Sequence, residues 1–185
     1  MKYLHEDIER VLISEQEIAE KTRELAKQIE NDHANSDKRL LLVSILKGSL
    51  MFTSELMKYL NIDCDIDFMK VSSYGCGTQS TLALSVLLDL DRKDFPDLDI
   101  IIVEDIIDSG NTLSHLTNML RMRGASSVKI CTLLDKPSRR VNDLKPDYCG
   151  FVVPDLFVVG FGLDYSQKYR NLPYIGILKP EIYEK

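Results

Sequence analysis

Apolar runs of strand length recur along the chain, separated by segments with helical periodicity. Residues 40–45 and 100–103 are almost entirely apolar, as expected for strands buried on both faces of a sheet. Residues 62–68 instead alternate apolar with acidic side chains, which predicts a strand with one face in water. Further strands are expected at residues 82–90, 128–134, 149–153, 157–160 and 175–178.

Three other segments have the features of helices. Ser14 with Glu17 three residues later forms a capping-box sequence, and an apolar helical face follows it. Residues 50–60 have a helical composition, and residues 112–123 are expected to form a helix that ends at Gly124. The apolar face of the first helix consists of Ile18, Thr22, Leu25 and Ile29.

The order of these elements predicts the fold class. Strands alternate with helices from residue 40 to residue 134, which predicts an α/β fold with a central parallel sheet flanked by helices. A chain of 185 residues is long enough for one such domain, so we expect residues 1–185 to form a single domain. In parallel sheets, ligands bind beyond the carboxyl ends of the strands.

Composition and charge exclude several classes of partner. The formal net charge is -6 and there is no Lys/Arg-rich run, so the sequence predicts no nucleic-acid partner. The four cysteines and three histidines show no zinc-ligand spacing. The first residues lack the apolar segment of a signal peptide, and no apolar run reaches the roughly 20 residues that span a bilayer. We therefore expect a cytoplasmic protein with no membrane partner.

The most informative segment follows the apolar run at residues 100–103. Glu104 and Asp105 come where that strand is expected to end, and Asp108 precedes a turn into the next helix. The turn consists of Ser109, Gly110, Asn111 and Thr112. Its backbone N–H groups, its hydroxyls and the helix N-terminus form a cradle for an anion. Three carboxylates beside such a cradle would repel a bare phosphate, but they suit a ligand that also presents hydroxyls or a metal ion, such as a sugar phosphate.

Residues 103–113, VEDIIDSGNTL, resemble the phosphoribosyl-pyrophosphate motif of the type I phosphoribosyltransferases, and in particular of their hypoxanthine-guanine branch. The resemblance implies that Glu104 and Asp105 bind the ribose hydroxyls and that Asp108 is the catalytic base for the purine N7 proton. It assigns the 5′-phosphate to residues 108–112. It also implies a sheet core over about residues 35–150, with a small hood subdomain formed by the N-terminal segment and residues 151–185.

Two further segments resemble the parts of this family that bind pyrophosphate. Leu46, Lys47 and Gly48 match the pyrophosphate loop, in which the bond before the lysine is commonly cis, so we expect a cis Leu46–Lys47 bond. By the same resemblance, Arg170 approaches the diphosphate. Asp164, with Glu104 and Asp105, is expected to hold Mg²⁺ bound to the diphosphate.

The base site and a closing loop complete the resemblance. Lys136 matches the lysine that donates to the exocyclic oxygen of a 6-oxopurine, which disfavours adenine. Phe157 is expected to stack on the purine, and the backbone of Val158 to contact its edge.

Ser73 and Tyr74 lie in a Gly-containing loop at residues 72–80. This loop is expected to be mobile and to close over the reacting centre. Phe161 stands where the family usually has tyrosine, with little consequence expected. Arg139 and Arg140 are interpreted as an exposed pair without a role.

The resemblance implies an enzyme of purine salvage that transfers the 5-phosphoribosyl group of phosphoribosyl pyrophosphate to hypoxanthine or guanine. The motif segment alone is also compatible with an N-capped helix after an acidic strand end, or with a receiver domain, although receivers distribute their acids over separate strands. A non-enzymatic regulator that senses phosphoribosyl pyrophosphate is the alternative from another class, but it would need a basic surface or an added domain. A transferase for xanthine or pyrimidines, the choice between hypoxanthine and guanine, and a homodimer or homotetramer all stay open.

Overall fold

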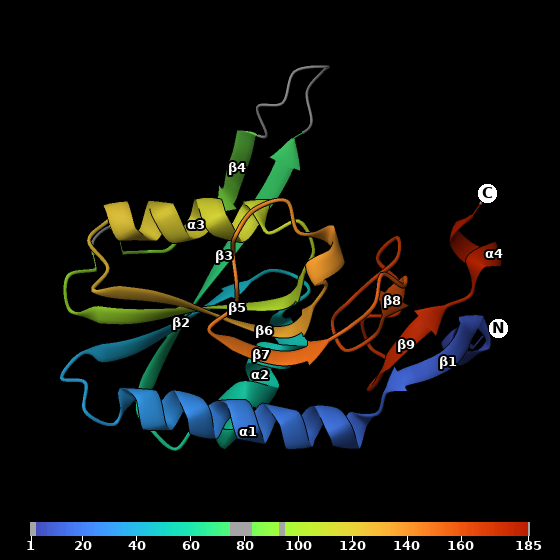
Figure 1. Ribbon diagram of the computed structural model, residues 1–185, viewed down its shortest axis with the longest axis horizontal. Helices are drawn as coiled ribbons and strands as arrows, with labels where there is room; N and C mark the ends of the chain where they lie inside the picture. The colour runs from blue at the N-terminus through green and yellow to red at the C-terminus, as the bar shows by residue number, and fades with distance from the viewer. Residues whose placement is uncertain (1–2, 75–82, 93–94, 185) are drawn as a thin grey trace.

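The protein folds around two sheets of unequal size (Figure 1). The computed structural model describes residues 3–74, 83–92 and 95–184. The larger sheet forms the centre of the molecule, and the smaller one lies at the end where β1 and β9 meet.

The large sheet has six described strands in the order β4-β3-β2-β5-β6-β7. β2 (Arg39–Ile45) and β5 (Leu98–Ile107) pair in parallel at its centre. The outer strands are β3 (Cys64–Tyr74), β4 (Ala83–Leu88), β6 (Ser127–Asp135) and β7 (Tyr148–Val152). Only β4 runs antiparallel to its described neighbour. This mostly parallel sheet confirms the predicted α/β fold.

Helices cover both faces of the large sheet (Figure 1). α1 (Glu15–His33) and α2 (Leu50–Tyr59) pack on one face, and α3 (Asn111–Met122) packs on the other. The predicted capping box is present: Glu17 N donates to Ser14 Oγ, and the Glu17 carboxylate accepts from Ser14 N. The four residues predicted for the apolar face of α1, Ile18, Thr22, Leu25 and Ile29, are all buried.

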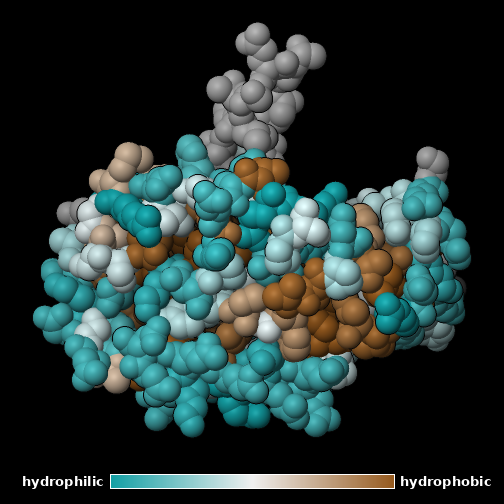
Figure 2. All heavy atoms as spheres, viewed as in Figure 1, coloured by the Kyte–Doolittle hydropathy of each residue, from teal (hydrophilic) through white to brown (hydrophobic). Residues whose placement is uncertain are grey.

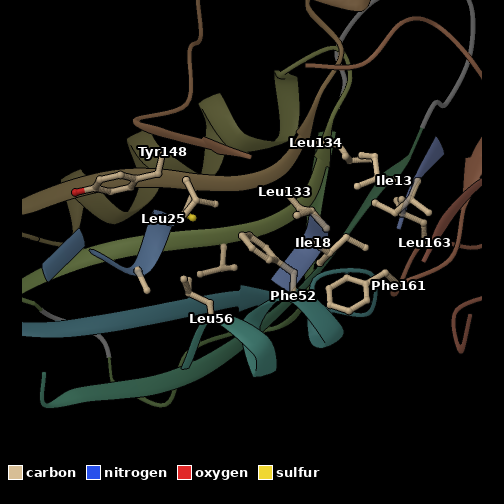
Figure 3. Close-up of a cluster of buried hydrophobic side chains, with 14 of the residues drawn as sticks. Ile13, Ile18, Leu25, Phe52, Leu56, Leu133, Leu134, Tyr148, Phe161 and Leu163 are labelled. Atoms are coloured by element: carbon tan, nitrogen blue, oxygen red, sulfur yellow. The ribbon is translucent and has the colours of Figure 1, made fainter. Parts of the chain in front are cut away.

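A continuous apolar core fixes the two sheets relative to each other. Ile18 of α1, Phe52 of α2 and Leu133 of β6 are buried together between the helices and the large sheet (Figure 3). Each such side chain contributes about 1.5–3 kcal/mol by its burial. Ile13 and Leu163 belong to the same cluster and connect it to the small sheet. The segments that reach from the small sheet to the edge of the large sheet are therefore held in place.

The small sheet brings the two ends of the chain together. β1 (Ile8–Ile13) pairs antiparallel with β9 (Ile175–Leu178), which pairs in turn with β8 (Val158–Val159). Short helical turns at Leu4–Asp7 and Pro180–Tyr183 (α4) flank it. Another turn, at Pro137–Arg139, follows β6. The backbone between β8 and β9 is thereby placed next to the carboxyl ends of the large sheet's strands.

The structure corrects the predicted loop after β3. Residues 72–74 were expected in a mobile loop, but the backbone of Ser73 and Tyr74 belongs to β3 and pairs with Leu84 and Ala83 of β4. Pairing between adjacent strands overrides the small, polar composition of this segment. The rest of the predicted loop, residues 75–80, lies outside the described residues.

Two strands of the large sheet also differ from the prediction in burial or extent. The alternation in β3 predicted one buried apolar face, yet Ile66 on that face is exposed. β5 extends four residues further than the apolar run indicated, so Glu104 and Asp105 lie inside the strand. Backbone pairing with β6, which continues as far as Ile107, accounts for this extension.

The surface is hydrophilic over α1, while hydrophobic side chains gather between β7 and the small sheet (Figure 2). Val11 of β1 and Val152 of β7 are among the exposed apolar residues. Within the described part of the chain, no helix combines the length and the apolar character needed to cross a bilayer.

Candidate active site at the carboxyl ends of the strands

The turn between β5 and α3 forms a hollow bordered by acids. Gly110 is the N-cap of α3 and has φ +80, a conformation that favours glycine. The amide of Asn111 donates to Ser109 Oγ over 3.4 Å, which shapes the turn. The hollow has a volume of about 120 Å³, and its polar lining comes from Glu104, Asp108, Ser109, Gly110 and Thr112. The structure therefore brings two of the three acids to the amide-lined turn.

Glu104 and Asp105 are half-buried residues whose carboxyl groups have few compensating contacts. The Glu104 Oε2 atom has no hydrogen-bond partner among the described residues. Burial, and secondarily the Asp105 charge, raise the pKa of Glu104 well above its usual range. Burial also raises the pKa of Asp105 to about 6, even though Asp105 Oδ1 accepts from the Ile106 amide over 2.8 Å. Both groups are suited to a ligand that donates hydrogen bonds to them or neutralises their charge.

The predicted pyrophosphate loop packs directly against Asp105. The Leu46–Lys47 peptide bond is cis, as predicted. A Cβ atom on Gly48 would lie 1.6 Å from Asp105 Oδ2, so only glycine fits there. From the other side, a Cβ atom on Gly162 would lie 2.0 Å from the Gly48 carbonyl oxygen. The structure thus brings three segments far apart in the sequence into contact.

Arg170 and Asp164 form an ion pair next to this contact, with 2.6 Å between Arg170 Nη2 and Asp164 Oδ1. Arg170 Nη1 donates to the Gly162 carbonyl over 2.7 Å, whereas its Nε is buried without a partner among the described residues. The Asp164 charge raises the pKa of Asp105 and the Arg170 charge lowers it, which shows that the three groups are close. An ion pair with an unused donor is suited to a further anion such as a diphosphate.

The predicted acids could hold a metal ion only if water and substrate phosphates complete its coordination. No group of three His, Cys, Asp or Glu residues within the described ranges is arranged to hold a metal ion. Asp164, Glu104 and Asp105 therefore do not form a complete protein cage. Mg²⁺ commonly binds through one or two carboxylates, with water and substrate phosphates completing its coordination. The unpartnered Glu104 Oε2 atom and the Asp164 carboxylate fit that mode of binding.

A second cavity, of about 350 Å³, adjoins the first. Asp108, Lys136, Phe157, Val158 and Asp164 all line it. The Lys136 side chain is buried, and its Nζ donates to the Leu156 carbonyl over 2.7 Å. The same Nζ lies 4.0 Å from Asp108 Oδ1, so a buried cation and a half-exposed carboxylate face the same space. These predicted base-site residues, distant in sequence, are brought together with Asp108.

Phe157 presents an aromatic ring at the edge of this cavity. The ring is partly exposed and stacks on Tyr183 with 4.6 Å between centroids, while Tyr165 contacts it edge-on. The Phe157 carbonyl accepts from Leu178 N over 2.9 Å, which ties it to β9. Phe161, with positive φ, packs in the apolar core instead of lining the cavity.

Sequence reasoning missed several residues of this region. Arg140 was interpreted as exposed, but its side chain is only 10% exposed and pairs with the Asp135 carboxylate. Arg139 is 52% exposed, yet it lines the base cavity and lies near Asp108 and Asp155. Tyr183 lines the same cavity from α4. The only sequence signal for the two arginines was their position just after Lys136, and Tyr183 had none.

Comparison with known proteins gives the family. A family model described as a phosphoribosyl transferase domain matches residues 12–166. The chain belongs to the phosphoribosyl transferase family. The hypoxanthine-guanine phosphoribosyltransferase of Bacillus subtilis (strain 168) is 52% identical over 178 residues, which cover 96% of this chain and 97% of that protein. The corresponding protein of Lactococcus lactis subsp. lactis (strain IL1403) is 50% identical over 184 residues, covering 100% and 98%.

A solved structure extends the likeness to three dimensions. The crystal structure of a hypoxanthine phosphoribosyltransferase from Staphylococcus aureus superposes with a TM-score of 0.92 at 46% identity, covering 98% of this chain and 97% of that one. The acidic strand end, the turn that follows it and the second cavity lie at the sheet edge where parallel sheets bind ligands.

Proposed function

We propose that the protein transfers the 5-phosphoribosyl group of phosphoribosyl pyrophosphate to hypoxanthine or guanine, giving IMP or GMP and pyrophosphate in purine salvage. One observation carries the proposal: Asp108 and Ile106 line both the hollow at the phosphate turn and the base cavity. A sugar phosphate in the first and a flat base in the second would therefore meet at Asp108. The relatives of similar sequence, hypoxanthine-guanine phosphoribosyltransferases by name, support the same substrates.

The base cavity favours a 6-oxopurine. Lys136 can only donate hydrogen bonds, so it binds a carbonyl oxygen and rejects the amino group of adenine. Phe157 offers a ring face for stacking, and the backbone of Val158 can contact the edge of the base. Val158 is itself buried in β8, which fixes that backbone.

The acids act on the ribosyl group and on the base. Asp108 takes the N7 proton while N9 attacks the ribose C1 carbon and the bond to pyrophosphate breaks. Glu104 and Asp105 accept hydrogen bonds from the 2′ and 3′ hydroxyls, and they place negative potential beside the positive charge that develops on the ribose. The 5′-phosphate binds to the amides and hydroxyls of residues 108–112.

The departing pyrophosphate is held by cations and backbone amides. Leu46, Lys47 and Gly48 bind it through the lysine cation and backbone amides. Arg170, whose Nε has no partner among the described residues, supplies a second cation. Asp164, with Glu104 and Asp105, would hold Mg²⁺ there. The bound ion would neutralise part of the diphosphate charge and so assist its departure.

Ser73 and Tyr74 are proposed to belong to a segment that closes over the reacting centre and excludes water. Residues 1–185 are proposed to act as one domain, in which the small sheet and residues 151–185 form a hood over a core at about residues 35–150.

A homodimer or homotetramer is proposed, because apolar side chains at Leu87 and Leu88 of β4 and at Leu50 of α2 are exposed. The described cysteines, Cys64, Cys131 and Cys149, are free, which supports a cytoplasmic location.

A base-addition assay tests the function. The protein is incubated with Mg²⁺, phosphoribosyl pyrophosphate and, separately, hypoxanthine, guanine, xanthine, adenine and uracil, and nucleotide formation is measured. IMP and GMP should form rapidly and AMP and UMP should not. Absence of nucleotide with every base, together with DNA binding in a gel-shift experiment, would instead support a regulator that only senses phosphoribosyl pyrophosphate.

A further inference from the structure

Two adjacent arginines after Lys136 point to different parts of the site. Arg139 lies near the Asp108 and Asp155 carboxylates at the base cavity, and its side chain is half exposed. Arg140 is buried and lies behind the phosphate turn, away from the described cavities. Arg140 therefore lines neither of the two cavities.

The Arg140 guanidinium connects the turn to the sheet. Its Nε donates to the Asp108 carbonyl over 3.0 Å. Its Nη1 donates to the Leu144 carbonyl, and its Nη2 to the carboxylate of Asp135, the last residue of β6. A guanidinium holds its donors in one rigid plane, so these three contacts fix the position of the Asp108 backbone. A lysine carries its three donors on a single nitrogen atom, which cannot reach acceptors spread around the whole guanidinium plane.

The residues after Arg140 continue the contact along the turn. Val141 N donates to the Ser109 carbonyl over 3.2 Å, and Asn142 Nδ2 donates to Asn111 Oδ1 over 3.2 Å. At Gly110, a Cβ atom would lie 2.7 Å from both Arg140 Cδ and Asn142 Oδ1. Each residue of the turn from 108 to 111 is thus contacted from behind by residues 140–142.

We propose that Arg140 is a positioning residue for the phosphate subsite, which holds the Asp108–Asn111 backbone so that its amides converge on the 5′-phosphate. The proposal rests on the function proposed above. Backbone amides bind an anion well only when several point at it together, and displacement of such groups by about 1 Å can cost about 100-fold in rate. Because Asp108 lies in the same turn, turnover should also depend on Arg140, but binding of the base should not.

The test uses Arg140→Met and Arg140→Lys in the full chain. We expect Arg140→Met to raise the KM for phosphoribosyl pyrophosphate by about tenfold or more and to lower kcat, while the KM for hypoxanthine changes less than about twofold. Arg140→Lys keeps a charge for Asp135 and should recover thermal stability. It should not recover the KM for phosphoribosyl pyrophosphate, because a single nitrogen atom cannot span the distance between the Asp135 carboxylate and the Asp108 carbonyl. A parallel recovery of stability and KM, or an equal rise in both KM values, would overturn the positioning role.

A milder variant covers the case in which Arg140→Met does not fold. Asn142→Ala removes the contacts of this amide with Asn111 Oδ1 and with Leu144 N, and it leaves the Arg140 side chain in place. It should raise the KM for phosphoribosyl pyrophosphate by about two- to fivefold, with an unchanged KM for hypoxanthine. Calorimetric titration with phosphoribosyl pyrophosphate and Mg²⁺ in the absence of base separates the two proposals. No binding to the parent protein contradicts the proposed function. Equal binding to the parent and to every variant that folds contradicts only the role of Arg140.

Discussion

Polar side chains gather at both ends of the large sheet, and the two groups differ in whether their atoms have partners. At the amino ends of the strands, Asp32 accepts from Lys129 Nζ over 2.9 Å and from Tyr148 Oη over 2.8 Å. The hydrogen bond from Lys129, followed by that from Tyr148, lowers the pKa of Asp32. Asp99 lies in the same region, where hydrogen bonds from Ser127 and Ser36 outweigh burial and lower its pKa as well.

At the carboxyl ends of the strands, by contrast, carboxyl groups have raised pKa values and some polar atoms lack partners. Burial raises the pKa of Glu104 and Asp105, and atoms of Glu104 and Arg170 lack partners among the described residues. Polar groups that are satisfied within the chain stabilise the fold, whereas unsatisfied ones decrease stability unless a ligand completes them. Incomplete contacts therefore distinguish the candidate active site from the opposite end of the sheet, and changes at the two ends should affect different properties.

The largest effect is expected at Asp108. Asp108→Asn removes the proton acceptor without changing the size of the side chain, so kcat should fall by about 10²–10⁴-fold. Binding of phosphoribosyl pyrophosphate, measured by calorimetry, should persist because the amides of the turn are unchanged. Near-normal turnover would remove Asp108 from the role of base.

Asp105→Asn should stabilise the ligand-free protein at neutral and higher pH. The pKa of Asp105 is raised from 3.8 to about 6, so the native state holds this proton more tightly than the unfolded state. As the pH rises through both values, the parent therefore loses stability relative to the variant, by about 2–3 kcal/mol in total. Urea unfolding of both proteins at about pH 4.5 and about pH 8 measures the difference. A variant less stable than the parent at both pH values would show that Asp105 is satisfied within the chain.

Lys136→Met tests the selectivity of the base cavity. Methionine has a similar length but cannot donate a hydrogen bond, so kcat/KM for hypoxanthine should fall by about 10–100-fold. The low activity with adenine should fall much less, and discrimination between the two bases should therefore decrease. Competition assays with both bases measure this ratio, and an unchanged ratio would exclude Lys136 from base recognition.

The smallest effect is expected at the amino ends of the strands. Tyr148→Phe removes the hydroxyl that contacts Asp32 and Lys129 and should lower the free energy of unfolding by about 1 kcal/mol. Because Tyr148 lies at the opposite end of the sheet from the site, kcat and both KM values should be unchanged. A loss of activity in fully folded protein would contradict the separation of the two ends.

The sequence could predict features formed by contiguous residues, but not those formed by residues from separate segments. Residues 103–113 are contiguous, so the acids, the turn and the helix start could be recognised together, and the fold class followed from buried strands alternating with helices. The role of Arg140 could not be predicted, because it depends on acceptors from β6 and from two separate loops. The extension of β3 through Tyr74 likewise depends on pairing with β4, which the small, polar residues of that segment do not indicate.

Glu104 and Asp105, the half-buried acids at the carboxyl ends of the strands, are expected to gain their missing partners from a ribose-phosphate ligand. Calorimetric titration of phosphoribosyl pyrophosphate with Mg²⁺ into the parent and Asp105→Asn proteins, at about pH 5 and about pH 7.5, tests it most directly. Affinity for the parent should increase with pH as Asp105 ionises to accept the ribose hydroxyls, and this increase should be clearly smaller in the variant. An identical pH dependence in the two proteins would contradict the claim.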